Sequence, residues 1–329
     1  MNEGLPTVRD VEDAAGRISD WLISTPVLEH DVLNRRASCR VLVKAESLQH
    51  TGTFKIRGAL NRLLKLSHDE RAAGVVAFSS GNHAQGVAMA AKWLGMPATI
   101  VMPEDAPKIK QLNTRMLGAD VVLYDRVKDD REQIASDIAA QRGAAIAPAF
   151  DHPDIIEGQG TVGLELSEFA LRRRLELESV FVPCGGGGLI AGSGLAIKAA
   201  FPDCQLFAVE PEAYDDTKRS LEAGSRQVVS GHPKSSCDAL MAPMPGAITF
   251  AINREQLSGA LTVTDTQAAH AMAFASRYLK VVLEPSGAVA LAAVLSGAAE
   301  DYDCVGIVLS GGNVDLDPYI DALRAFPDP

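Results

Sequence analysis

The stretch that decides the fold is Ser179-Val-Phe-Val-Pro183-Cys184-Gly185-Gly186-Gly187-Gly188-Leu189, which continues with helix-favouring residues to Ala200. A short apolar run, four consecutive glycines and a helical stretch predict a strand over 179–183, a tight turn and a helix over 189–200. Glycines let backbone N–H groups approach an anion, and a helix N-terminus adds partial positive charge. The turn is therefore a candidate phosphate-binding loop.

Short apolar runs of this kind recur along the chain and alternate with longer stretches of helical character. They span 40–45, 75–78, 98–102, 121–124, 179–183, 205–209 and 304–309. A helix is also predicted over 82–94, because this stretch opens after Ser-Ser-Gly and closes at Gly95. The alternation predicts an α/β fold with mostly parallel sheets, in which ligands lie at the carboxyl ends of the strands.

The glycine run leaves two other interpretations open. Gly186, Gly188 and Ala191 satisfy the dinucleotide pattern G-x-G-x-x-A, and Glu210 ends the next apolar run, where a ribose-binding acid would lie. A nicotinamide dehydrogenase is therefore an alternative from a different class of enzyme. The glycines would also suit a turn that only permits close packing.

Composition excludes several classes of partner. The net charge is −11, with 42 acidic against 31 basic residues, so neither nucleic acid nor an anionic membrane surface is expected as a partner. The five cysteines form no Cys-x-x-Cys pair, which fits a reducing compartment. The N-terminus lacks a signal-peptide pattern, and the longest apolar stretch, 287–299, is too short to span a bilayer. We expect a soluble, cytoplasmic protein.

A second segment reads Lys44-Ala-Glu46-Ser-Leu-Gln49-His-Thr51-Gly52-Thr53-Phe54-Lys55-Ile-Arg57-Gly58-Ala59. Taken alone, a lysine near a helix start is usually a solvated surface charge. The segment resembles, however, the cofactor-lysine segment of the serine/threonine dehydratase and serine racemase family, K-x-E-x-x-Q-x-T-G-S/T-F-K-x-R-G-A. This family belongs to fold type II of the pyridoxal-phosphate enzymes, which is tryptophan synthase β-like. The resemblance continues at 79–86, at the glycine run, at 284–288 and at 310–313.

The resemblance implies two open, twisted, mostly parallel α/β domains with pyridoxal 5′-phosphate in the cleft between them. It predicts a large cofactor-binding domain from 1–68 and 150–329, a small mobile domain over 69–149, and a homodimer. Lys55 would bind the cofactor covalently, Phe54 would pack on its ring, Asn82 would bond its 3′ oxygen and Ser310 would face its ring nitrogen. The phosphate would lie on Gly185, Gly186, Gly187 and Gly188, and Glu284 belongs to the cofactor-binding set. The substrate loop would consist of Ser79, Ser80, Gly81, Asn82 and His83.

The predicted reaction is a dehydration that releases a keto acid and ammonia from a small hydroxy-amino acid of the L-serine or L-threonine type. Lys55, as a free amine, would remove the Cα proton. Ser310 cannot hold a proton on the ring nitrogen as an aspartate would, which favours loss of a β-substituent over transamination. Alternatives on the same scaffold are a threo-3-hydroxyaspartate dehydratase, a serine racemase and a dehydratase of a hydroxyectoine pathway. A non-catalytic binding protein would be expected to have lost Lys55 or the glycine run.

Ser80 distinguishes branches of the family. The threonine deaminases resemble Ser-Ala-Gly-Asn-His at this place, whereas the racemases and hydroxyaspartate dehydratases resemble Ser-Ser-Gly-Asn-His, as in this chain. The Ser80 hydroxyl would act as acid or base on the cofactor face opposite Lys55. The alternative is that Ser80 only bonds the loop backbone.

Two further positions bear on cations and on substrate choice. In the racemase and dehydratase branch, an acidic segment like 210–216 holds Mg²⁺ or Ca²⁺, and the matching ligands here are Glu210, the carbonyl of Tyr214 and Asp216. The alternative is a solvated acidic loop. Ala239 stands where the family usually has glycine, so its methyl group is expected to reshape the substrate pocket.

Overall fold

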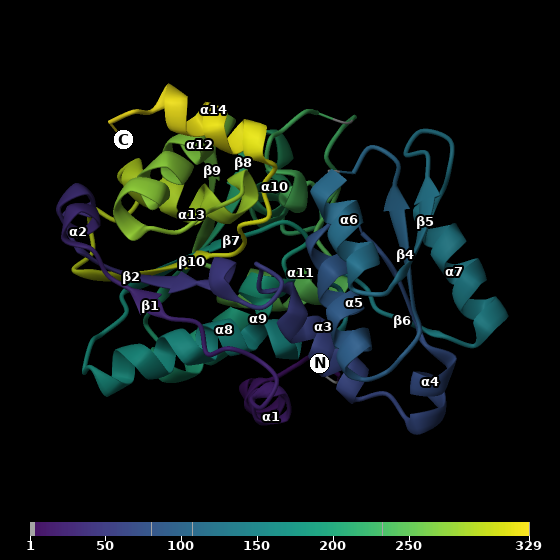
Figure 1. Ribbon diagram of the computed structural model, residues 1–329. Helices are drawn as coiled ribbons and strands as arrows, with labels where there is room; N and C mark the ends of the chain where they lie inside the picture. Colours follow the sequence, from purple (N-terminus) through teal and green to yellow (C-terminus); the bar gives the residue numbers. More distant parts are fainter. Residues whose placement is uncertain (1–3, 80, 107, 232, 329) are drawn as a thin grey trace.

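The computed structural model describes residues 4–79, 81–106, 108–231 and 233–328. Within these ranges the chain forms a six-stranded sheet and a four-stranded sheet, each with helices on both faces (Figure 1). We call them the larger sheet and the smaller sheet.

The larger sheet has the strand order β1-β2-β10-β7-β8-β9. Neighbouring strands are parallel except for β1 and β2, which pair antiparallel. The strands are β1 Val27–Leu28, β2 Arg40–Ala45, β7 Ser179–Pro183, β8 Gln205–Pro211, β9 Gly259–Val263 and β10 Cys304–Leu309. Parallel strands are connected by crossover helices that pack on the faces of the sheet, so both faces of the larger sheet are covered.

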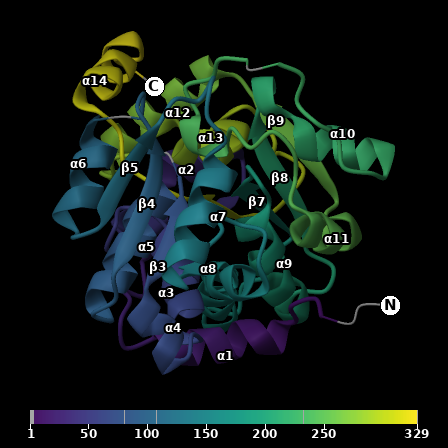
Figure 2. The same ribbon diagram turned by 90° about the vertical axis from the view of Figure 1, so that its right-hand side faces the viewer.

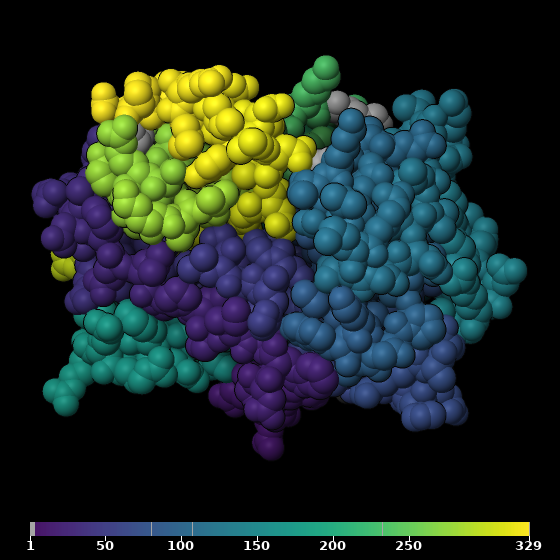
Figure 3. All heavy atoms as spheres, in the orientation of Figure 1, coloured from purple at the N-terminus to yellow at the C-terminus, as the bar shows by residue number. Residues whose placement is uncertain are grey.

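The smaller sheet has the strand order β5-β4-β3-β6, and all its pairs are parallel. Its strands are β3 Val75–Phe78, β4 Ala98–Pro103, β5 Asp120–Tyr124 and β6 Ala145–Ile146. Figure 2 looks onto the α7 side of this sheet. On the face shown in Figure 3, the blue to teal segment that carries the smaller sheet forms a contiguous block on the right.

The helices divide between the two sheets. Those that accompany the larger sheet are α1 Val8–Ile18, α2 Asp31–Ala37, α3 Lys55–Leu64, α8 Pro153–Arg172, α9 Gly188–Ala200, α10 Asp216–Ala223, α11 Ala247–Gln256, α12 Asp265–Phe274, α13 Pro285–Leu295 and α14 Leu316–Ala325. Those that accompany the smaller sheet are α4 His68–Ala73, α5 Asn82–Trp93, α6 Lys108–Met116 and α7 Arg131–Arg142. Short 3₁₀ turns occur at η1 Glu46–Leu48, η2 Glu212–Tyr214 and η3 Asp238–Leu240, and a π-helical turn at η4 Ala275–Leu279.

The pleat of the larger sheet separates its core into two layers. Val41 and Val43 of β2 pack in the cluster with α12 and α13, whereas Leu42 packs in the cluster with α8 and α9. Successive strand residues point to opposite faces, so a continuous apolar strand is buried on both sides. In Figure 1 the helices α12, α13 and α14 lie above this sheet and α8 and α9 lie below it.

Helix α3 lies between the two sheets and carries Lys55 at its first position. Ile56 and Leu60 belong to the same apolar cluster as residues of α5, β3 and β4. On its other side α3 approaches α8 closely, since a Cβ on Gly158 would lie 2.6 Å from the Cα of Gly58. Because α3 is packed on both sides, the position of Lys55 at its first turn is fixed in space.

The predicted α/β class with mostly parallel sheets is confirmed. The strands predicted over 40–45, 75–78, 179–183 and 304–309 are confirmed to the residue, and β4, β5 and β8 extend one or two residues further than predicted. The sequence did not indicate β1, β6 or β9, and the helix predicted over 82–94 ends one residue earlier. The domain boundaries at 68/69 and 149/150 remain predictions. Among the described residues, no helix is both long enough and apolar enough to cross a membrane.

Candidate active site

The side chain of Lys55 lies between the two sheets, partly buried. Its Nζ donates a hydrogen bond to the carbonyl oxygen of Ala149 at 2.9 Å and lies 5.1 Å from the centroid of the Phe54 ring. Desolvation lowers the pKa of Lys55 to about 8, although the charge of Glu284 opposes this shift. A lysine with such a pKa is available as a neutral amine near neutral pH, as a nucleophile or base requires.

Ser310 lies beside this lysine, directly after the carboxyl end of β10. The backbone N–H of Phe54 donates to the carbonyl of Ser310 at 3.2 Å, and the N–H of Gly312 donates to the carbonyl of Gly52 at 2.9 Å. These bonds join the segment before α3 to the segment after β10. The structure therefore brings Phe54, Lys55 and Ser310 together, as the sequence predicts.

The glycine run forms the turn between β7 and α9. Gly187 has φ of +90°, in the left-handed region, and caps α9, which begins at Gly188. The carbonyl of Gly186 accepts a hydrogen bond from Thr249 Oγ1 at 2.7 Å, and a Cβ on Gly186 would collide with the ring of Phe150. With its carbonyl fixed and no side chain in the way, the loop presents a helix N-terminus suited to an anion.

Asn82 opens α5 and is held from two sides. Its Nδ2 donates to Oε1 of Glu284, and its Oδ1 accepts from Nδ2 of Asn313 at 3.0 Å. Glu284 is the residue before α13, which accompanies the larger sheet, and Asn82 begins α5, which accompanies the smaller sheet. The hydrogen bond between them therefore connects the two parts of the molecule. Burial raises the pKa of Glu284.

The remaining residues of the predicted substrate loop lie close by. Ser79 Oγ accepts from the N–H of Gly81 at 3.1 Å. His83 Nε2 lies 2.8 Å from the carbonyl of Ala147. Desolvation, reinforced by the charge of Lys55, lowers the pKa of His83 to about 3, so the imidazole is neutral. Ser80 lies outside the described residues.

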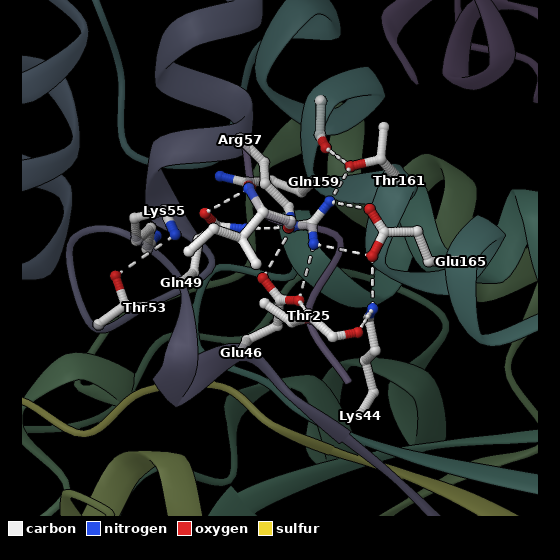
Figure 4. A network of polar contacts seen from close by, with 12 residues as sticks. Thr25, Lys44, Glu46, Gln49, Thr53, Lys55, Arg57, Gln159, Thr161 and Glu165 are labelled. Atoms are coloured by element: carbon white, nitrogen blue, oxygen red, sulfur yellow. Dashed lines mark hydrogen bonds and ion pairs between the residues drawn. The ribbon is translucent and has the colours of Figure 1, made fainter. Parts of the chain in front are cut away.

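A buried ion network anchors the start of α3 (Figure 4). Arg57, only 1% exposed, donates to both oxygens of Glu46 at 2.7 and 2.9 Å and to both oxygens of Glu165 at 2.6 and 3.0 Å. Lys44 ion-pairs with Glu165 and donates to the carbonyl of Thr25. Arg57 lies two residues after Lys55, so its ion pairs connect the start of α3 to η1 and α8. Each charged side chain of the network has a partner of opposite charge.

The predicted cation ligands surround the start of α10. The carboxylate of Glu210, at the end of β8, accepts from the N–H groups of Thr217 at 2.8 Å and Lys218 at 2.9 Å. Asp216 is fully buried, and within the described part of the chain neither of its carboxylate oxygens has a hydrogen-bond partner. Desolvation raises the pKa of Asp216 to about 7, and desolvation together with the charge of Asp216 raises that of Glu210 to about 8.

Comparison with known proteins identifies the family. A family model described as "Pyridoxal-phosphate dependent enzyme" matches residues 18–311. The chain belongs to this family of pyridoxal-phosphate dependent enzymes. It is 45% identical to an L-threo-3-hydroxyaspartate ammonia-lyase of Saccharomyces cerevisiae, over 98% of each chain. It is 42% identical to a serine racemase of Schizosaccharomyces pombe, over 96% of each chain. Among solved structures, a T.th. threonine deaminase superposes with a TM-score of 0.90 at 43% identity, covering 95% of this chain and 100% of the other.

These comparisons confirm the predicted family, the fold type II architecture, the cofactor and the class of pyridoxal-phosphate dependent lyases. The nicotinamide alternative finds no support in them. Glu210, which that alternative would place on a ribose, instead directs its carboxylate to the N-terminus of α10.

The residues present fit pyridoxal phosphate. The turn at 185–188 offers a helix N-terminus where a Cβ would meet the Phe150 ring or the side chain of Asn253. Lys55 is a low-pKa amine that bonds the carbonyl of Ala149, next to the Phe150 that packs at this turn. Asn82, with its amide oriented by Glu284 and Asn313, has one N–H left for a ring oxygen. A phosphate-bearing aldehyde with a ring oxygen needs this set of groups.

The sequence did not point to several residues that complete the site. They are Ala149 and Phe150, in the loop before α8, and Lys110, whose Nζ contacts both Glu284 and Asp238. None stands in a motif of its own. Ala239, whose methyl group was expected to reshape the pocket, lies in η3, and its N–H donates to Ser286 Oγ at 3.0 Å.

Proposed function

We propose that the enzyme dehydrates a small β-hydroxy amino acid and prefers L-threo-3-hydroxyaspartate, from which it would release oxaloacetate and ammonia. The observation that carries the proposed chemistry is the low-pKa amine of Lys55, placed beside a phosphate-binding turn and an oriented amide. The similarity to the yeast L-threo-3-hydroxyaspartate ammonia-lyase supports the choice of substrate.

The residue roles in this proposal are those that the family resemblance implies, and the contacts between the residues support them. Gly185 to Gly188 would hold the phosphate of pyridoxal phosphate, Asn82 would bond its 3′ oxygen, and Phe54 would pack on its ring. Bound pyridoxal phosphate supplies the electron sink that makes the substrate's Cα proton acidic. Ser310 would face the ring nitrogen with a hydroxyl, which would give this nitrogen no fixed negative partner and would favour elimination. Ser79, Gly81, Asn82 and His83 surround the substrate carboxylate.

Lys55 is the group that moves the proton at Cα. Its neutral amine would take this proton, and return of a proton from the resulting ammonium to the β-hydroxyl would let the hydroxyl leave as water and would restore the neutral amine. The resulting enamine rearranges to an imine, and hydrolysis of the imine gives the keto acid and ammonia, so that one water leaves and one is consumed. The carbonyl of Ala149 orients the amine without adding a negative charge to it.

Dehydration of L-serine or L-threonine is the second candidate, and the similarity to the T.th. threonine deaminase supports it. Racemisation of serine is a side activity that the Ser-Ser-Gly-Asn-His segment and the yeast racemase similarity favour, with Ser80 as the group on the face opposite Lys55. A hydroxyectoine-pathway substrate has no comparable support.

The quaternary and regulatory features are part of the same proposal. Residues 69–149 form the small domain, which closes on the larger one, and the chain works as a homodimer in the cytoplasm. Glu210, Asp216 and the carbonyl of Tyr214 bind Mg²⁺ or Ca²⁺. Among the described residues neither carboxylate oxygen of Asp216 has a hydrogen-bond partner, which supports this site, because a buried carboxylate without a partner is costly and a cation would satisfy it.

A substrate panel tests the proposal. The holoenzyme would be incubated with L-threo-3-hydroxyaspartate, L-serine, L-threonine and the hydroxyectoine-derived amino acid, and keto acid and ammonia would be measured. We expect kcat/KM to be at least ~10-fold higher for hydroxyaspartate than for serine or threonine. Equal or lower values would reject the preferred substrate, and no keto acid from any compound would reject the function. Lys55→Ala should reduce the rate by at least ~10²- to 10⁴-fold.

A further inference from the structure

Lys110 reaches the site from the opposite side to most other residues. It lies on α6, beside the smaller sheet, and its side chain is only 3% exposed, whereas Lys108 and Ile109 on the same helix are exposed. Its Nζ lies 2.8 Å from Asp238 Oδ2 and 3.3 Å from Glu284 Oε2. Both carboxylates belong to elements that accompany the larger sheet. A buried lysine that crosses between the two parts of the molecule calls for an explanation.

The stem of Lys110 also shapes the substrate loop. A Cβ on Gly81 would collide with Cδ of Lys110, so the loop residue next to Asn82 has to lack a side chain. Lys110 therefore contacts this loop through its methylene groups and Glu284 through its ammonium group.

Glu284 links Lys110 to Asn82. One of its oxygens accepts from Asn82 Nδ2, while the other accepts from Lys110 Nζ. Asn313 donates to the amide oxygen of Asn82 and Glu284 accepts from its amide nitrogen, so Glu284 has to act as an acceptor for the amide to be held from both sides. A protonated Glu284 would present a hydroxyl that competes as a donor and would weaken this arrangement.

The charges around Glu284 explain why it needs a cation. Burial raises the pKa of Glu284 and the charge of Asp238 raises it further, whereas the charge of Lys110 lowers it, so Lys110 favours the ionised form of this carboxyl. The groups that face it are Lys110 from α6, Asp238 from η3, Asn82 from α5 and Lys55 from α3. Burial lowers the pKa of Lys110, but Glu284 and Asp238 outweigh this effect and raise it, so Lys110 stays charged.

We propose that Lys110 is a positioning residue, which keeps Glu284 ionised and thereby holds the Asn82 amide turned toward the cofactor ring. The proposal rests on the role of Asn82 given under Proposed function. Lys110 lies on α6 beside the smaller sheet, and Glu284 precedes α13 beside the larger sheet. The ionisation of Glu284 therefore also depends on the contact between these two parts of the molecule. Lys110 itself touches neither the cofactor nor the reacting atoms in this role.

The test compares Lys110→Gln and Lys110→Arg with Lys108→Gln, which alters an exposed lysine on the same helix. For each holoenzyme we would follow the near-visible absorbance of the bound cofactor from pH 6 to 10, the cofactor Kd by dialysis, and kcat and KM. Lys110→Gln should shift the midpoint of the absorbance change, weaken cofactor binding about 10-fold and lower kcat roughly 10- to 100-fold, because a hydrogen bond to a charged group is lost. Lys110→Arg should recover most of this, and Lys108→Gln should match the wild type.

A double variant isolates the route through Glu284. If Lys110 acts through Glu284, then Lys110→Gln combined with Glu284→Gln should be no worse than Glu284→Gln alone, and multiplied losses would overturn the proposal. A wild-type absorbance titration in Lys110→Gln, or no recovery in Lys110→Arg, would also overturn it. If Lys110→Gln does not fold, Glu284→Gln takes its place in the absorbance titration. A titration of Glu284→Gln that matches the wild type would then overturn the proposal. Absorbance and Kd need no substrate, so they decide the matter even if the dehydratase function fails.

Discussion

Lys55 Nζ donates its hydrogen bond to the backbone carbonyl of Ala149, at 2.9 Å, and not to a carboxylate. A carbonyl oxygen accepts from a neutral amine as well as from an ammonium group, so this contact orients the lysine without strongly favouring its charge. The loop that carries Ala149 also provides Phe150 to the glycine turn. One loop therefore touches both Lys55 and the glycine turn at 185–188.

The first prediction concerns the pH dependence of cofactor capture. The pKa of Lys55 is lowered to about 8, so the neutral, nucleophilic fraction rises as the pH passes through about 8 and not through the ordinary value near 10.5. The rate at which enzyme stripped of cofactor binds added pyridoxal phosphate should increase with this midpoint. Stopped-flow absorbance measures it. Glu284→Gln should move the midpoint lower, because Glu284 raises the pKa of Lys55. A midpoint near 10 would contradict the role of burial.

The second prediction concerns stability. Arg57→Met leaves Glu46 buried without its cation, which should lower the free energy of unfolding by ~3–5 kcal/mol. Arg40→Met is the matched control, because Arg40 also pairs with a glutamate, Glu29, but at the surface, where about 1 kcal/mol or less is expected. Urea unfolding of both variants gives the comparison. Similar losses in the two would mean that the Arg57 network contributes no more than an exposed pair.

The third prediction separates the two faces of the cofactor. Removal of the Ser80 hydroxyl by Ser80→Ala should suppress racemisation and elimination from the D-isomer, while elimination from the L-isomer by Lys55 persists. A planar carbanion takes a proton only from a group within hydrogen-bond reach of that face. Keto-acid release from both enantiomers of serine and of threo-3-hydroxyaspartate, with chiral analysis of the remaining substrate, measures the difference. Equal losses on both enantiomers would leave Ser80 with a role in the loop backbone only.

Much of the site could be predicted because its residues follow apolar strands. Gly185 follows β7 and Ser310 follows β10, two parallel strands of the larger sheet whose carboxyl ends lie at the same edge, whereas Ser79 follows β3 of the smaller sheet. Strands β1 and β6 have two residues each, and β9 is mostly half-buried, so none carries a clear apolar pattern. These strands could not be recognised without their partners.

Lys110 shows why other contacts could not be predicted. In sequence it is one of two lysines at the start of a polar helix, and the other, Lys108, is an ordinary exposed lysine. The difference arises because α6 packs over Gly81, which directs one lysine toward Glu284 and Asp238. That information lies in contacts between residues more than a hundred positions apart.

The fourth prediction concerns the cation site at Glu210 and Asp216. Their pKa values, about 8 and about 7, lie above those of the unfolded chain, so between pH 4 and 8 the folded state binds more protons. Without a cation, stability from these groups should fall as the pH rises across this range. Added Mg²⁺ or Ca²⁺ binds the ionised carboxylates and should raise the Tm more at pH 8 than at pH 6, where it has to displace protons.

The matched pair of variants for this site is Asp216→Asn and Asp215→Asn. Asp216 is buried, and neither of its carboxylate oxygens has a partner in the part of the chain that the structure describes, whereas Asp215 is half-buried and pairs with Arg219 at 2.7 Å. Asp216→Asn should abolish the response of the Tm to the cation and reduce the loss of stability toward pH 8, because one buried ionisable group is gone. Asp215→Asn should keep both effects. If the Tm of the wild type is the same after chelation and after re-addition of either ion, these carboxylates bind no cation and the segment is simply a buried acidic pair.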